Sequence, residues 1–278
     1  MYNTPMDLDT ALPLLAGDPA APLDVAELAL LLARDEYSHL DTEGELAELA
    51  VLARELKPRL RGGLTARVEA LCRYLFHDLG FHGNEKDYYD PRNSYLNDVL
   101  ARRTGLPITL SVVAIAIGTR AGLDVVGVGL PGHFIAKAIE RGQEVFFDPF
   151  RGGRVLSAGE CSALVEEIVG TPFEATPDAL AGVAVGYVVQ RMLNNLKGVF
   201  LRQRDFPRAA RTIARLIQLC PDDATQRRDQ GAVLLQAGRA GQAIGHLETY
   251  LGGDPPPEDS RAVRELLDQA RGEVARWN

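Results

Sequence analysis

Cysteine is scarce in this chain, and this scarcity narrows the classes of protein to which it can belong. The 278 residues include three cysteines, Cys72, Cys161 and Cys220, with no CxxC pair. This usage excludes a disulfide framework and a cysteine-based zinc site, and it is typical of a reduced protein. The N-terminus has neither a basic segment nor an apolar segment after it, so we expect no secretory signal and a cytoplasmic location.

Long apolar runs and an excess of positive charge are also absent. The longest apolar run, 108–117, is interrupted by two hydroxyl residues and is far shorter than the ~20 residues that a membrane-spanning helix needs. The net charge of −8 has the wrong sign for general nucleic-acid binding, which requires clustered Lys and Arg. No local ligand spacing joins His82, His133 and the carboxylates. We therefore expect no membrane or nucleic-acid partner, no metal and no cofactor.

The first part of the chain is helical after a proline-rich start. Residues 1–22 contain four prolines and no sustained period, so we expect a loosely held lead-in. From residue 23 leucines recur about one turn apart, and Asp24 can cap the first helix. A third helix is expected over 65–79, ending at Gly80. These residues form the helical N-terminal part of a domain that we expect to span 23–176.

A buried helix and a small sheet are predicted next. Residues 108–121 are apolar on nearly every side, which indicates a helix buried all round, and Pro107 suits its first turn. Strand-like runs follow at 123–128, 134–139 and 144–147, and the turn at 140–143 suits an antiparallel hairpin between the last two. The fold class is therefore α+β.

The remainder, 177–278, is predicted to be a helical domain with an internal repeat. Small, apolar and proline residues recur 34 positions apart, in the pairs Ala209/Ala243, Phe200/Leu234, Ile213/Leu247 and Pro221/Pro255. A period of 34 with these residue types is the tetratricopeptide signature. The match is degenerate, because Arg227 and Gln230 stand where bulky apolar residues are expected. Helical repeats of this kind indicate a protein partner.

Several motifs in this order resemble one protein family. They are GFHGN at 80–84, NSYLNDVL at 93–100, RTGLPITLS at 103–111, GVGLPGHF at 127–134, DPF at 148–150 and RMLNNLK at 191–197. Together they resemble the SirB-type family of transglutaminase-like proteins with a tetratricopeptide tail. The resemblance implies a papain-like transglutaminase core, in which a Cys opens a buried helix and a His and an Asp follow on neighbouring strands.

The resemblance also implies that the usual nucleophile is missing. Counting back from Gly122, the position of the catalytic Cys falls at about Pro107, which has no nucleophilic side chain. The candidate partners His133 and Asp148 remain, and they can form a hydrogen-bonded pair on adjacent strands. Thr109 and Ser111 lie close to the nucleophile's place, but within a helix such hydroxyls more often bond back to the carbonyl one turn earlier.

Other polar residues admit both a binding role and a structural one. Asn93, Asn97, Thr109, Ser111, His133 and Asp148 are the residues expected to line the cleft. Asn93 and Asn97 can equally cap and brace the turn before the buried helix. The loop residues His82, Asp87, Tyr88, Tyr89 and Asp90 can form a recognition surface or cover the core.

Three hypotheses about function follow. The first is a non-catalytic, ligand- or protein-binding adaptor that uses its cleft and its helical repeats. The second is a hydrolase or acyl transferase that uses His133 and Asp148 with a hydroxyl or an unrecognised thiol. The third is a structural scaffold with no ligand in the cleft. The side chains that lie near the His133 ring distinguish the first hypothesis from the second.

Overall fold

The computed structural model describes residues 6–276, which form two compact units. The core unit runs from Pro19 to Met192, and the repeat unit joins Leu193–Asn278 to the N-terminal segment Met1–Asp18. The two units divide after residues 18 and 192, and the domain boundaries expected after residues 22 and 176 stay a prediction. Among residues 6–276, none of the helices has the length and apolar character needed to span a bilayer.

The fold is α+β, as the sequence predicted, and the core unit holds all of the strands among the described residues. Its elements are α2 (Val25–Ala33), α3 (Thr42–Leu56), η1 (Lys57–Arg59), α4 (Leu64–Cys72), η2 (Arg73–Asp78), β1 (His82–Gly83), η3 (Pro91–Asn93), α5 (Leu96–Arg102), β2 (Thr104–Gly105), α6 (Pro107–Ala121), β3 (Asp124–Leu130), β4 (His133–Glu140), β5 (Gln143–Asp148), β6 (Arg154–Leu156) and α7 (Ala158–Val169).

Helix boundaries in this unit follow from local chemistry. The Asp24 carboxylate caps α2 by accepting the backbone N–H of Ala26 at 2.8 Å, as predicted. Pro107 is the first residue of α6, where its missing N–H costs no helical hydrogen bond. The same helix ends at Gly122, whose φ of 100° is strained for any residue with a β-carbon. Twelve of the fifteen residues of α6 are buried, which confirms the expectation of a helix covered all round.

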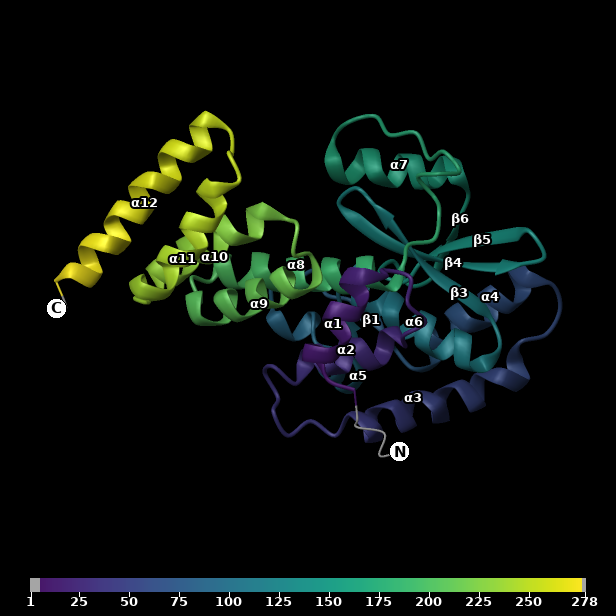
Figure 1. Ribbon diagram of the computed structural model, residues 1–278. Helices are drawn as coiled ribbons and strands as arrows, with labels where there is room; N and C mark the ends of the chain where they lie inside the picture. Colours follow the sequence, from purple (N-terminus) through teal and green to yellow (C-terminus); the bar gives the residue numbers. More distant parts are fainter. Residues whose placement is uncertain (1–5, 277–278) are drawn as a thin grey trace. The chain divides into compact units, whose positions relative to one another are not determined.

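A four-stranded antiparallel sheet, in the order β3-β4-β5-β6, forms the other half of the core unit. The expected hairpin is present, because Glu140 pairs with Gln143 across a turn in which Arg141 and Gly142 have positive φ. Helices α6 and α4 cover one face of the sheet, and α7 covers the other (Figure 1). The first six residues of β4 are therefore buried, on both faces, in agreement with the unbroken apolar character of that stretch.

Two segments differ from the expectation. The helix predicted over 65–79 is α4 followed by the π-helical turn η2, and the chain then leaves the helix at Gly80, whose φ is 74°. Within the supposed lead-in, residues 8–17 form helix α1 (Leu8–Gly17). Its N-cap is Asp7, and its buried side chains are Leu8, Ala11, Leu12 and Leu15. Residues 1–5 of the lead-in lie outside the described residues.

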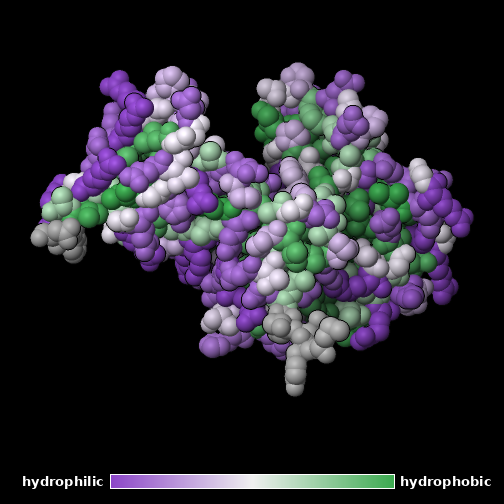
Figure 2. Space-filling view, viewed as in Figure 1, coloured by the Kyte–Doolittle hydropathy of each residue, from purple (hydrophilic) through white to green (hydrophobic). Residues whose placement is uncertain are grey.

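The repeat unit is helical throughout its described part. Its helices are α1, the C-terminal part of α8 (Val185–Arg202), α9 (Phe206–Leu219), α10 (Ala224–Gln236), α11 (Ala240–Gly252) and α12 (Pro257–Ala275). Helix α1 packs on α9, and its Asp9 accepts a hydrogen bond from Arg215 at 2.6 Å. Figure 2 shows hydrophilic residues over the outer side of α12, whose opposite side buries Val263, Leu267 and Ala270.

The 34-residue period corresponds to equivalent places in successive helical hairpins. Ala209 and Ala243 are fully buried on α9 and α11, and the other apolar partners, Phe200, Leu234, Ile213 and Leu247, are buried as well. Pro221 and Pro255 each follow the end of a helix, where a residue without an N–H stops further helical bonding. The sequence repeat therefore corresponds to a structural repeat, in which residues 34 positions apart are buried at equivalent places.

Gly231 fixes how closely α10 and α11 approach. A β-carbon at this residue would lie 2.5 Å from two side-chain atoms of Leu247, which is fully buried. We therefore expect Gly231→Ala to lower the free energy of unfolding by about 1–3 kcal/mol, although alanine favours a helix over glycine. Gly245→Ala on α11 is the matched control, because no atom lies within 4 Å of the new β-carbon. It should raise stability by about 0.5–1 kcal/mol. Urea denaturation of both variants measures the contrast, and equal effects would contradict it.

Candidate functional site

The strand register brings the predicted His and Asp together. Ala136 pairs with Phe147, so Asp148 stands opposite Ile135, and His133 is two residues further along on the same face of β4. Diagonal neighbours of this kind are within reach of long side chains. His133 Nε2 lies 2.9 Å from Asp148 Oδ2, and both residues are buried. The strand register thus places His133 and Asp148 side by side.

Backbone groups hold both members of the pair. Asp148 Oδ1 accepts the N–H of Phe150 at 2.9 Å and that of Arg151 at 3.4 Å, so the carboxylate also closes the turn after β5. The Arg191 guanidinium on α8 donates to the carbonyls of Leu130 and His133, each at 3.0 Å. It thereby fixes the β3–β4 hairpin from which His133 projects. The Asp148 carboxylate is the hydrogen-bond partner of His133 Nε2. No hydrogen-bond partner of His133 Nδ1 lies among the described residues.

Aromatic rings extend from the His133 ring to the polar, aromatic loop. The Phe150 ring meets the His133 ring edge-on, with centroids 6.1 Å apart, and the Tyr88 ring meets Phe150 at 6.2 Å. Gly83 permits this approach, since a β-carbon there would lie 2.6 Å from the Phe150 ring. Burial raises the pKa of the Tyr88 hydroxyl above its ordinary value, so this phenol stays neutral. The polar, aromatic loop is therefore connected to the His–Asp pair through Phe150.

Thr109 and Asn93 form a second group, before the buried helix. Thr109 Oγ1 donates to the Asn93 carbonyl at 2.8 Å and accepts the N–H of Leu106 at 2.9 Å. The Asn93 amide in turn donates to the carbonyls of Asp87 and Tyr88, at 2.7 and 3.3 Å. These residues tie the loop to the start of α6. Asn93, Tyr88 and Phe150 connect the group around Thr109 to the group around His133.

Ser111 and Asn97 lie within helices rather than against the His133 ring. Ser111 Oγ donates to the Pro107 carbonyl at 2.8 Å, the back-bonding to the preceding turn that the sequence suggested. Asn97 is on α5, and its Oδ1 is buried without a hydrogen-bond partner. Of the six residues expected to line the cleft, the structure therefore joins His133 to Asp148 and Asn93 to Thr109, and it leaves Ser111 and Asn97 apart.

The thiols are held in their protonated form. Burial raises the pKa of Cys72 to about 12, and burial with the nearby Glu160 and Asp148 carboxylates raises the pKa of Cys161 to about 11. Burial also raises the pKa of Cys220, which belongs to the repeat unit. A nucleophilic cysteine instead needs a depressed pKa and a positively charged neighbour. All three behave as buried or half-buried apolar groups.

His82 and Asp90 of the aromatic loop are bonded to residues on either side of the loop. His82 places Nδ1 at 3.0 Å from the Gly80 carbonyl and Nε2 at 3.2 Å from the Thr104 hydroxyl. Burial opposes ionisation of Asp90, but hydrogen bonds from Arg92 and the charge of Arg102 hold its pKa below the ordinary value. Tyr89 remains exposed beside Tyr88. Within residues 6–276, no group of three or more His, Cys, Asp or Glu side chains could hold a metal ion.

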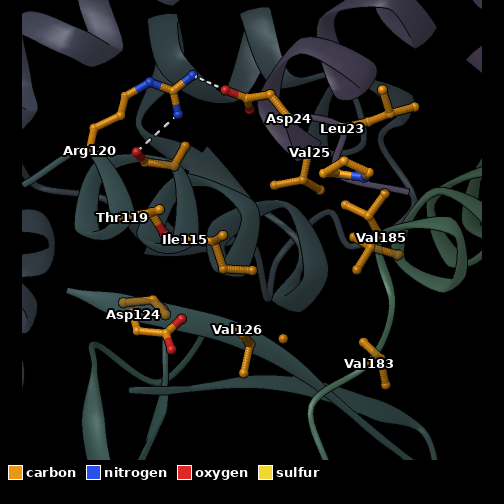
Figure 3. Close-up of a pocket in the computed structure, with 15 residues that line it drawn as sticks. Leu23, Asp24, Val25, Ile115, Thr119, Arg120, Asp124, Val126, Val183 and Val185 are labelled. Carbon is orange, nitrogen blue, oxygen red and sulfur yellow. Dashed lines mark hydrogen bonds and ion pairs between the residues drawn. The ribbon is translucent and has the colours of Figure 1, made fainter. Parts of the chain in front are cut away.

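Two cavities of the core unit differ in how they lie relative to the pair. One of about 90 Å³ adjoins Asp148 and is lined by the ion pairs Arg151–Glu167 and Arg154–Glu160, so its charges are compensated. It is too small for most organic ligands. Another, of about 410 Å³, has walls of Val25, Ile115, Val126, Val183 and Val185, with Thr119, Asp124 and the Asp24–Arg120 ion pair as its polar groups (Figure 3). No residue expected to line the cleft lines this larger cavity.

Sequence reasoning missed two residues that position the pair. Phe150 was noted only as part of a motif, and its contact with His133 depends on the turn after β5. Arg191 is 58 residues from His133 in sequence, and its bonds to the hairpin carbonyls depend on the packing of α8. Both residues lie in the DPF and RMLNNLK motifs, and that was the available signal.

Comparison with known proteins agrees with this architecture. Residues 43–194 match the model of a transglutaminase-like superfamily, and residues 196–268 match a tetratricopeptide repeat. A UPF0162 protein of Xylella fastidiosa (strain Temecula1) is 36% identical, covering 88% of this chain and 89% of its own length. A UPF0162 protein of Pasteurella multocida is 28% identical, over 84% and 86%.

A human protein shares only part of the chain. F-box only protein 21 is 32% identical over 49% of this chain, which is 22% of that protein. The two bacterial matches, in contrast, cover more than four fifths of this chain and of their own length. The chain belongs to the transglutaminase-like superfamily and to the UPF0162 family, with tetratricopeptide repeats after its transglutaminase-like domain.

Proposed function

We propose that this chain is a non-catalytic, SirB-type transglutaminase-like protein that binds a protein partner through its helical repeats. The observation that carries the proposal is the buried His133–Asp148 pair, in which no thiol or hydroxyl of residues 6–276 makes a hydrogen bond to His133 Nδ1. Acyl transfer of this type requires a nucleophile within hydrogen-bond reach of the base. In this role the pair braces the sheet, and the surface around it binds a ligand or a segment of the partner.

The candidate nucleophiles support the same proposal. The hydroxyls of Thr109 and Ser111 donate to backbone carbonyls, and the raised thiol pKa values oppose thiolate formation. Pro107, at the start of α6, offers no reacting group. The hydrolase or acyl transferase hypothesis retains one supporting observation, the 2.9 Å bond between His133 and Asp148. The scaffold hypothesis differs from ours only in having no bound ligand.

The repeat unit supports the partner-binding half of the proposal. Tetratricopeptide arrays stack helical pairs into extended binding surfaces, and this unit carries such helices from α8 to α12. The three free cysteines support a location in a reducing compartment, which we propose to be the cytoplasm. We expect no cofactor in this role, because binding through repeats requires none.

A turnover assay with a His133 variant tests the non-catalytic half. The purified full chain is incubated with an activated ester, and separately with a glutamine peptide and a fluorescent primary amine. His133→Gln keeps a hydrogen-bonding side chain at the pair. We expect the wild type and this variant to give the same background rates. Ester cleavage or amine incorporation that depends on His133 would overturn the non-catalytic role and favour the enzyme hypothesis.

Co-purification from the native cell tests the partner-binding half. Leu201 is an exposed apolar residue on α8 in the repeat unit, and Leu14 is an exposed apolar residue on α1. We expect Leu201→Glu to lose proteins that co-purify with the wild type, and the matched Leu14→Glu to keep them. If both variants retain every co-purifying protein, the repeats do not supply the partner surface.

A further inference from the structure

Positive charge gathers on one helix of the repeat unit, although the whole chain is acidic. The net charge is −8, yet α9 contains three arginines and no acidic residue. One of them, Arg215, is paired with Asp9 of α1. The other two, Arg208 and Arg211, line a cavity of about 420 Å³ together with Arg239. The residues that line the cavity include no carboxylate, and although Asp205 pairs with Arg208 from outside it, three guanidinium groups give the cavity a basic lining.

A buried amide faces this cavity and lacks a hydrogen-bond partner. Gln230 lines the cavity with 6% of its surface exposed, and its Oε1 is buried and unpaired. A buried polar atom without a partner is costly, so such a group is rare unless something outside the chain binds it. This residue also stands where the repeat pattern calls for a bulky apolar side chain. Gln230 therefore places a polar group at the cavity where an apolar side chain would pack better.

The rest of the cavity suits a ligand that is partly apolar. Leu234, Ala210 and Pro207 form its non-polar wall. The Arg208 guanidinium is held in place by Asp205 Oδ2 at 3.0 Å and lies over the Phe200 ring, whereas no carboxylate of the described residues pairs with Arg239. The volume is that of a pocket for an organic ligand rather than for a single small ion.

We propose that this cavity binds an acidic peptide segment of the partner protein. A ligand carboxylate lies against Arg239 and Arg208, its aliphatic stem packs on Leu234, and peptide groups of the segment hydrogen-bond the Gln230 amide after it turns. A nucleic acid is the less suitable occupant, because the chain is acidic overall and no aromatic ring lines the cavity for base stacking. This inference rests on the proposed function and specifies the chemistry of its partner.

Fluorescence anisotropy with the full chain tests the proposal. The probes are a short labelled peptide of alternating glutamate and alanine, and the same peptide with glutamine for glutamate. We expect saturable binding of the glutamate peptide and at least about tenfold weaker binding of the glutamine peptide. Equal binding of the two probes, or no binding of either, would overturn the proposal. Neither result depends on turnover at His133, so this failure is distinct from failure of the non-catalytic role.

Two variants and one control assign the binding to this cavity. Arg239→Glu should weaken the glutamate peptide about tenfold or more, and it places an acid at the N-terminus of α11, where a negative charge suits the helix. Arg264→Glu on α12 is the matched control, with the same charge change outside the cavity, and should leave binding unchanged. Gln230→Leu should weaken binding while raising the midpoint of thermal unfolding, because it restores the apolar residue of the repeat.

Three outcomes would contradict this assignment. If Arg239→Glu and Arg264→Glu weaken peptide binding equally, the binding depends on the overall charge of the chain and not on this cavity. If Gln230→Leu binds the glutamate peptide as well as the wild type does, the Gln230 amide does not contact the peptide. Tighter binding of a labelled single-stranded oligonucleotide, lost in Arg239→Glu, would make the occupant a nucleic acid and overturn the proposal.

Discussion

Replacing Asp148 with alanine is expected to lower the free energy of unfolding of the core unit by about 3–5 kcal/mol. The side chain is fully buried, and its two oxygens accept from the His133 ring and from the N–H groups of Phe150 and Arg151. Alanine leaves all three donors without an acceptor, in an environment that water reaches poorly. Urea denaturation monitored by circular dichroism measures the loss of stability. If the two compact units unfold in distinct transitions, each transition is fitted by itself.

Asp148→Asn is the matched control, because it keeps the shape and one carbonyl oxygen. That oxygen can accept the N–H of Phe150, and the amide can donate to His133 Nε2 when the proton moves to Nδ1. We expect a loss of about 1–2 kcal/mol, smaller than for alanine. A loss below about 1 kcal/mol for Asp148→Ala would mean that the pair does not brace the sheet, and the structural role given to it here would be wrong.

The elements that the sequence predicted well are those whose pattern is local. The buried helix α6 follows from an unbroken apolar run after Pro107, and the β4–β5 hairpin follows from a turn with Gly142 between two strand-like runs. The period of 34 likewise places Ala209 and Ala243 on equivalent packed faces. For the helix and the hairpin, the residues that determine the element lie within it. For the repeats, they recur at a fixed interval along the chain, so neither prediction needs knowledge of distant contacts.

The elements that sequence reasoning missed depend on contacts between distant residues. Helix α1 contains Pro13 and lies among several prolines, so its local pattern is that of a loop, yet its leucines are buried and Asp9 pairs with Arg215. The π-helical turn after α4 likewise has no local signal. It packs on Gly153, where a β-carbon would lie 2.5 Å from the Phe76 ring and 2.6 Å from Cys72 Cβ. Tertiary packing overrides local propensity in both places.

In the candidate site, too, one part could be predicted from the sequence and another could not. His133 and Asp148 could be paired from their separation along two adjacent strands, and the hydrogen bond agrees with that reasoning. The role of Thr109 could not be predicted, because its acceptor is the carbonyl of Asn93, 16 residues earlier. Counting along the helix placed this hydroxyl near a missing nucleophile. The hydrogen bonds instead make it the residue that ties the loop to the helix.

Replacing Thr109 with valine is therefore expected to cost about 2 kcal/mol of stability, because the side chain keeps its shape and loses its hydroxyl. The Leu106 N–H then loses its 2.9 Å acceptor and keeps only the longer 3.4 Å bond to the Asn93 carbonyl, and that carbonyl loses the hydroxyl donor, all in buried surroundings. Thermal and urea unfolding of the purified chain measure the effect, and protease sensitivity of the loop before α5 should rise with it, since that loop is held through Asn93.

Ser111→Ala, two residues along the same helix, separates this role from a catalytic one. Ser111 makes a single bond back to Pro107, and bonds of this type contribute little to a helix, so its loss should stay below about 1 kcal/mol. Thr109→Ser, which keeps the hydroxyl, should recover most of the stability lost in Thr109→Val. Equal effects of Thr109→Val and Ser111→Ala would contradict the assignment. If Thr109→Val were as stable as the wild type, its hydroxyl would be available for another role, and the enzyme hypothesis would regain a candidate nucleophile.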